Sequence, residues 1–130
     1  MKEKVEGGHG SESAEAAKEI IREKIPEIIS GMDSLEAYYN YDNGWYSGDD
    51  EEGHPVWNHW SAGLDRLKKE LGRDLSDGEL TAYSLSLCYG PLPVLDDQEA
   101  GMLYKEIWPD GNQRGFSLSP DKFKEKLSKF

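Results

Sequence analysis

Apolar residues recur every three or four positions in four stretches of this chain, which is the spacing of one face of an α-helix. The first stretch follows Ser11 and Ser13, either of which can cap a helix, and its apolar positions are Ala17, Ile21, Ile25, Ile28 and Met32. The second stretch ends at Gly72, a residue type that commonly ends helices, and its apolar positions are Trp60, Leu64, Leu67 and Leu71. Each apolar face must pack against another element, so the chain is constrained to a mainly helical fold.

The other two stretches carry clear signals for the start of a helix. Ser76 and Glu79 have the spacing of a capping box. The apolar face that follows this box is Leu80, Tyr83 and Leu87. We expect this helix to end near Gly90. Ser119 followed by Pro120 starts the last stretch. Its apolar face is Phe123, Leu127 and Phe130.

Two features modify the end of the first helix. Pro26 lies inside its apolar stripe, where it removes a backbone donor and disfavours helical geometry at Ile25. We therefore expect a kink at this point or a break into two shorter helices. Asp33 followed by Glu36 has the spacing of a further capping box, which predicts a short helical turn over residues 35–39.

Residues 36–47 fit either a helix or a strand. Asn43-Gly44 is a typical hairpin turn, which would pair residues 38–41 with residues 45–46. Residues 40–55 contain three glycines and a proline, so we expect them to be largely loop, and the hairpin is the alternative.

Residues 97–108 are ambiguous in the same way. The capping-box spacing of Asp96 and Glu99 predicts a helix. The competing interpretation is a hairpin closed by the Pro-Asp-Gly-Asn turn at residues 109–112. We favour the hairpin, so the predicted fold class is α+β, mainly α: a small single-domain helical bundle with a short β-hairpin near residues 102–118.

The chain has 130 residues, which is the usual size of one domain. Residues 1–10 have no apolar periodicity, so we expect a flexible leader followed by one compact domain over residues 11–130. Cys88 is the only cysteine, which excludes an internal disulfide and indicates a reducing compartment. The apolar runs are far shorter than the roughly 20 residues that cross a bilayer, so we expect a cytoplasmic protein.

The charges are segregated along the chain. Its formal net charge is -11, yet residues 25–65 contain nine acidic residues and no Lys or Arg, and residues 74–104 contain six acidic residues and no Lys or Arg. Negative charge of this kind disfavours a direct nucleic-acid ligand and an anionic membrane surface. It favours a basic protein partner, such as a nuclease or a nucleic-acid-binding protein, which the acidic segments would attract.

Aromatic residues concentrate in the same acidic segment, since residues 25–65 hold seven of the fourteen aromatics. Tyr and Trp supply large rigid contact areas at interfaces, and carboxylates bind Lys and Arg by charge-assisted hydrogen bonds. We expect Trp45 and Tyr46 to be exposed anchors, whereas Trp60 lies on a helical stripe and is expected in the core. The predicted partner-binding residues are Asp42, Trp45, Tyr46, Asp49, Asp50, Glu51, Glu52 and Trp57.

No motif of an enzyme, a cofactor site or a metal site survives inspection, so an enzyme is disfavoured and no cofactor is expected. The acidic loop is not an EF-hand, because an EF-hand beginning at Asp42 would place Gly53 at its last ligand position. His54 and His59 lack the spacing of a helical zinc pair. Cys88 lies in an apolar helical stretch, where we expect a buried and inert thiol.

These features favour a small acidic binding protein that neutralises a basic macromolecular partner, of the immunity, antitoxin or anti-defence inhibitor type. It would act by covering the phosphate-binding surface of that partner. One alternative is a carbohydrate-binding or carbohydrate-cleaving domain that uses Trp and Tyr stacking together with carboxylates. A second alternative is a structural adaptor domain in which the aromatics are buried and the charge serves solubility.

Overall fold

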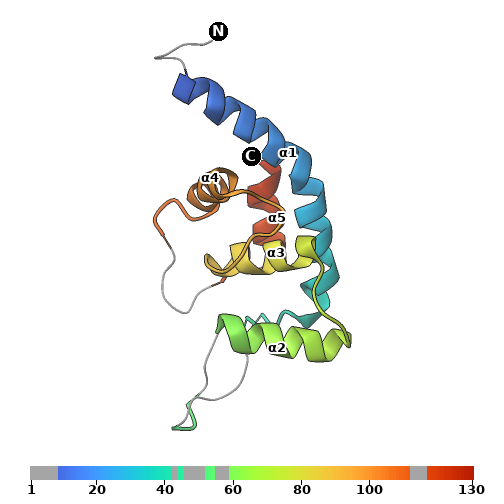
Figure 1. The fold of residues 1–130 in the computed structure, drawn as a ribbon. Helices are drawn as coiled ribbons and strands as arrows, with labels where there is room; N and C mark the ends of the chain where they lie inside the picture. Colours follow the sequence, from blue (N-terminus) through green and yellow to red (C-terminus); the bar gives the residue numbers. More distant parts are fainter. Residues whose placement is uncertain (1–8, 42–43, 46–51, 55–58, 112–116) are drawn as a thin grey trace.

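The fold is described by a computed structural model for residues 9–41, 44–45, 52–54, 59–111 and 117–130, and for residues 9–13 only the backbone is described. Within these ranges the chain forms one small helical domain without strands (Figure 1). Its elements are α1 (His9–Leu35), the 3-10 turn η1 (Glu36–Tyr38), α2 (Trp60–Leu71), α3 (Asp77–Leu87), α4 (Asp97–Ile107) and α5 (Pro120–Ser128).

Local capping chemistry explains where most of these helices begin. The side chains of Ser76, Asp96 and Ser119 each accept a hydrogen bond from the backbone N–H three residues later, at the starts of α3, α4 and α5. The helices predicted after Ser76 and Ser119 therefore form, and after Asp96 the helix forms that was the alternative to the favoured hairpin. Gly72 ends α2 in the left-handed conformation at φ 72°. His59, a residue that the periodicity did not single out, caps α2 through its ring nitrogen.

The first helix is longer and less interrupted than the sequence indicated. It begins at His9, so the predicted leader over residues 1–10 falls partly on α1 and partly on residues 1–8, which lie outside the described ranges. Pro26 lies inside a continuous helix, so the expected break is wrong. Figure 1 shows α1 changing direction along its course, as the expected proline kink would require.

The predicted hairpin near residues 102–118 is wrong for the residues that the structure describes, because residues 97–107 form α4. Both halves of the Asp96–Glu99 capping box are present, and they satisfy two backbone donors at once. Leu103 and Ile107 are buried one helical turn apart. Gly101 is exposed with no neighbour near its Cα, so it costs the helix only its low intrinsic propensity.

Residues 36–41 likewise follow neither prediction in full. The turn η1 forms where a short helical turn was expected, but Leu35 rather than Asp33 precedes it and no side chain caps it. Asn40 and Gly44 form one isolated antiparallel bridge, and in the described part of the chain no strand extends from either residue. The alternative hairpin around Asn43-Gly44 is therefore reduced to this single pair.

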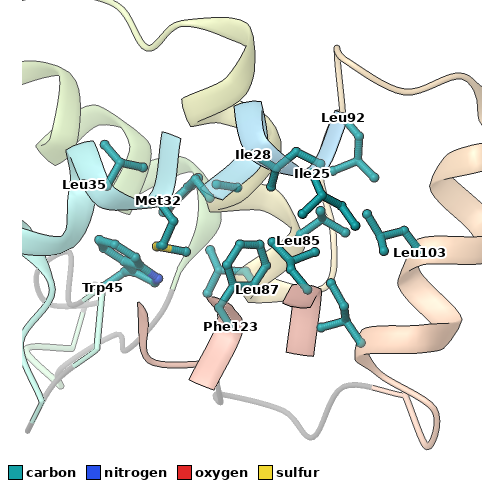
Figure 2. Close-up of a cluster of buried hydrophobic side chains, with 14 of the residues drawn as sticks. Ile25, Ile28, Met32, Leu35, Trp45, Leu85, Leu87, Leu92, Leu103 and Phe123 are labelled. Carbon is teal, nitrogen blue, oxygen red and sulfur yellow. The ribbon is translucent and has the colours of Figure 1, made fainter. Parts of the chain in front are cut away.

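Helix α3 is the buried centre of the domain. Nine of its residues are buried, including every residue from Thr81 to Leu87. Figure 2 shows Leu85 and Leu87 of α3 among side chains from α1, α4 and α5. These neighbours are Ile25, Ile28, Met32, Leu103 and Phe123. A helix that is buried on most sides loses its amphipathic pattern, so the sequence showed only one of its buried faces.

Two glycines allow α1 and α3 to cross closely. A methyl group added at Gly31 would overlap the carbonyl group of Gly78, and one added at Gly78 would lie 2.9 Å from the carbonyl oxygen of Glu27. The backbones of the two helices therefore touch at this crossing, where no larger residue fits. This close contact positions the end of α1 against the centre of the domain.

Candidate functional site

The structure describes two of the eight predicted partner-binding residues. Six of them lie outside the described ranges: Asp42, Tyr46, Asp49, Asp50, Glu51 and Trp57. Glu52 is exposed, as a residue that binds a partner must be. Trp45 is only 2% exposed, so the expectation that its ring is an exposed anchor is corrected.

Trp45 can be buried because α3 provides a hydrogen-bond acceptor for its indole N–H. Its indole N–H donates to the hydroxyl of Ser86 at 3.1 Å. Its ring packs edge-to-face on Tyr39 at 4.9 Å and on Tyr83 at 5.6 Å between centroids. A buried indole requires a hydrogen-bond acceptor, and Ser86 provides one in an otherwise apolar helix. The serines within the otherwise apolar helix α3 are the sequence signal for such acceptors.

Two further tryptophans donate hydrogen bonds to α3. Trp60 is half-buried, and its indole N–H donates to the hydroxyl of Ser84 at 3.2 Å, so the expected core position of Trp60 is met only in part. Trp108 is also half-buried and donates to the carbonyl oxygen of Leu85 at 2.7 Å. Three of the four tryptophans therefore hold the domain together.

The hydroxyl of Tyr83 belongs to the same buried arrangement. It donates to the carbonyl oxygen of Trp60 at 2.7 Å. Burial, with smaller contributions from Tyr89 and Asp65, raises the pKa of Tyr83 well above its ordinary value. Tyr83 therefore remains a neutral donor across the physiological pH range.

Cys88 is not buried in the core, where it was expected. It follows the last residue of α3, is half-buried, and adopts the left-handed conformation at φ 71°. The thiol thus lies at a helix end, and the helix is shorter than the predicted end near Gly90.

Aromatic and acidic side chains that remain accessible lie in the last turn of α1 and just after it. We call Asp33, Glu36, Tyr38, Tyr39 and Tyr41 the tyrosine–carboxylate surface. Tyr41 is 72% exposed and packs edge-to-face on Tyr39, with 5.5 Å between the ring centroids. Tyr39 is half-buried against the Trp45 ring, so the exposed Tyr41 ring is supported by an aromatic stack that leads into the core.

The two carboxylates of this surface converge on one cation. The ammonium of Lys124, on α5, lies 2.7 Å from Asp33 Oδ1 and 2.7 Å from Glu36 Oε1. Hydrogen bonds to Asp33 and Glu36 raise the pKa of Lys124 above its ordinary value. Asp33 and Glu36 therefore bind a lysine rather than form the capping box that their spacing suggested.

The second acidic segment, residues 74–104, contains carboxylates that are structural. Glu79 accepts two hydrogen bonds from the guanidinium of Arg73, at 2.8 and 2.9 Å, and one from the backbone N–H of Ser76. The hydrogen bonds from Arg73 lower the pKa of Glu79 to about 2. Glu99, which is also buried, accepts a hydrogen bond from Lys24 at 3.4 Å. Part of the negative charge of this segment thus stabilises the starts of α3 and α4.

Among the described residues, no group of three or more His, Cys, Asp or Glu side chains is arranged to hold a metal ion. Within the same ranges, none of the helices combines the length and the apolar character needed to cross a bilayer. His54 and His59 are both exposed, and the ring of His59 is engaged as the cap of α2.

Among the described residues, the accessible aromatic and acidic side chains at the end of α1 form the tyrosine–carboxylate surface. Its accessible elements are a supported tyrosine ring and two carboxylates that already hold an ammonium group. Comparison of the chain with protein families, with curated proteins and with solved structures found no match.

Proposed function

We propose that this chain is a small acidic binding protein that neutralises a basic macromolecular partner, in the manner of an immunity protein, an antitoxin or an anti-defence inhibitor. The partner is a basic protein such as a nuclease, and binding covers the surface with which that protein holds phosphate groups. A cytoplasmic location fits this role.

One observation carries the proposal: Tyr41 exposes 72% of its surface within a segment, residues 25–65, that contains no Lys or Arg. An exposed aromatic ring in a segment whose charged residues are all acidic combines the two properties that recognition of a basic protein requires. The ring supplies area that can be desolvated, and the net charge of -11 attracts an approaching cationic surface, which then competes with Lys124 for Asp33 and Glu36.

The geometry of Lys124 supports the same proposal. Its ammonium group contacts both Asp33 and Glu36, so these carboxylates are spaced to hold a single cationic side chain. The stack of Tyr41, Tyr39 and Trp45 keeps the binding ring rigid, which reduces the entropy lost on binding. In this proposal Trp45 acts from beneath the surface, as a support for Tyr39, and not as a contact residue.

The proposal is tested by titrating a fluorescently labelled deca-arginine peptide into the protein and following its anisotropy at low and at high salt. We expect the Tyr41→Ala variant to weaken binding about fivefold to tenfold, since loss of an interface tyrosine commonly costs more than 1 kcal/mol. Added salt should weaken binding to the wild-type protein, because steering by exposed charges is screened.

The matched control is Ile20→Ala, which truncates another exposed side chain, on α1, that is 38% exposed. This variant should bind the peptide as the wild-type protein does. Equal affinities of the Tyr41→Ala and wild-type proteins would refute the proposal, because any remaining binding would then reflect net charge alone.

A second candidate function, a structural adaptor domain, is favoured by the burial of Trp45. If the aromatics serve only the core, the tryptophans should be shielded from solvent. Quenching of tryptophan fluorescence by iodide would then be weak, and deca-arginine would bind with the same affinity to the Tyr41→Ala and wild-type proteins. The carbohydrate alternative is weakened by the same observation, because the Trp45 ring has no free face on which a sugar can stack.

A further inference from the structure

A cavity of about 330 Å³ lies where α4 leads toward α5. Its volume is at the lower end of the range for pockets that hold small molecules. The residues that line it are Ile107, Trp108, Pro109, Asp110, Gly111, Ser117, Leu118 and Lys126. None of these residues belongs to the tyrosine–carboxylate surface, so the cavity is a separate feature of the molecule.

The apolar wall of the cavity is anchored to the central helix. The indole N–H of Trp108 donates to the carbonyl oxygen of Leu85 at 2.7 Å, which fixes the orientation of the ring. The backbone N–H of Leu118 donates to the carbonyl oxygen of Ser86 at 3.0 Å. Because both residues are held by adjacent carbonyl groups of α3, this wall is formed before any ligand arrives.

The cavity is also lined by a cation, Lys126, for which the described residues supply no counter-ion. Of the three lysines on α5, Lys122 pairs with Glu125 at 3.9 Å and Lys124 pairs with Asp33 and Glu36. Lys126 is half-buried, and in the described part of the chain no carboxylate lies within ion-pair distance of it. A partly buried charge favours a partner of opposite sign, because it has lost part of its hydration.

Asp110, the other charged residue that lines the cavity, does not neutralise Lys126. Asp110 is exposed and forms no ion pair with Lys126. Asp110 is therefore exposed at the rim, whereas the Lys126 residue is half-buried where it lines the cavity. A ligand that completes the site must supply negative charge to Lys126 and a flat apolar face to Trp108.

We propose that this cavity binds a small aromatic carboxylate. The ring of the ligand stacks on Trp108 above the apolar side chains of Ile107 and Leu118, and its carboxylate accepts a charge-assisted hydrogen bond from Lys126. The proposal concerns a binding site only and is independent of the basic partner proposed above.

The test uses 1-naphthoate as the probe and follows the indole N–H signals of the four tryptophans by NMR. We expect the Trp108 signal to shift in a saturable manner. Lys126→Met should weaken binding about tenfold, since a hydrogen bond to a charged group contributes about 1.5–3 kcal/mol. Lys122→Met, which makes the same charge change on α5, should leave the affinity unchanged.

A second comparison keeps the test decisive if Lys126→Met does not fold. The neutral alcohol 1-naphthalenemethanol has nearly the same shape as the acid and should bind the wild-type protein about tenfold more weakly. Equal affinities for the acid and the alcohol would overturn the proposal. So would undiminished binding to a folded Lys126→Met variant, or a shift of Trp108 by methyl glucoside but not by naphthoate, which would indicate a sugar site.

Discussion

Two buried glutamates show how single residues define the starts of helices in this protein. Glu79 and Glu99 each occupy the third position of a helix, accept a hydrogen bond from the residue that caps it, and also receive a cationic side chain. The capping spacing was readable from the sequence because its partners lie three residues apart. The pairing of Glu99 with Lys24 was not, because the two residues lie far apart in the chain and only folding brings them together.

The pair formed by Glu79 and Arg73 predicts an acid-sensitive contribution to stability. The pKa of Glu79 is lowered from 4.5 to about 2, so the folded protein keeps this carboxylate charged where the unfolded chain is already protonated. Its contribution is present above pH 4.5 and is lost as the pH falls toward 2. We expect Glu79→Gln to lower the free energy of unfolding at pH 7 by about 2 kcal/mol, measured by urea denaturation.

Between pH 7 and pH 3, the free energy of unfolding of the same variant should fall less than that of the wild-type protein. Glu106→Gln, which neutralises an exposed glutamate on α4, is the control and should change stability at pH 7 by less than about 0.5 kcal/mol. If Glu79→Gln and wild-type curves ran parallel from pH 7 to pH 3, the structural role assigned to this carboxylate would be wrong.

At the scale of elements, apolar periodicity predicted α2, α3 and α5, because each has a cap at its start and an apolar stripe that packs on the core. It failed at α4, where Met102 to Trp108 also fits a strand next to a turn sequence. The capping box settled this competition in favour of the helix. Pro26 did not break α1, because the helix is held on both sides of it by buried residues such as Ile21 and Ile28.

The crossing of α1 and α3 yields a paired prediction about glycines. Gly31→Ala should lower the free energy of unfolding by about 1–3 kcal/mol, because the added methyl group overlaps the carbonyl of Gly78 and forces the helices apart. Gly101→Ala, in an exposed position inside α4 with open space around it, should raise stability by about 0.5–1 kcal/mol. Thermal unfolding followed by circular dichroism measures both changes. A neutral Gly31→Ala would show that the two backbones do not touch.

At the scale of the whole molecule, the segregation of charge was visible in the sequence. Which of the acidic residues are structural was not visible there. The excess of acids in residues 74–104 is partly structural, since Glu79 and Glu99 are buried and paired. Trp45 belongs to the core because Ser86 accepts its indole N–H, and no local pattern connects these two residues. Within the described residues, the candidate surface lies at the end of α1 and in the residues that follow it, while most of the predicted loop after Asp42 lies outside the described ranges.

A second acidic feature of the molecule allows the proposed surface to be distinguished from net charge. Glu15, Glu19, Glu23 and Glu27 recur every four residues and are exposed along α1. Lys18, Arg22 and Lys24 alternate with this row, as Lys124 accompanies Asp33 and Glu36, so a cationic ligand that responds only to charge should spread its contacts over both features.

The most direct test is an NMR titration of the wild-type protein with deca-arginine, in which the backbone amide shifts are mapped along the chain. Specific recognition predicts that the largest shifts lie within residues 33–41, that they saturate, and that they diminish when Tyr41 is replaced by Ala. Shifts concentrated on the glutamate row of α1, or spread evenly over all acidic residues, would contradict the proposed binding function.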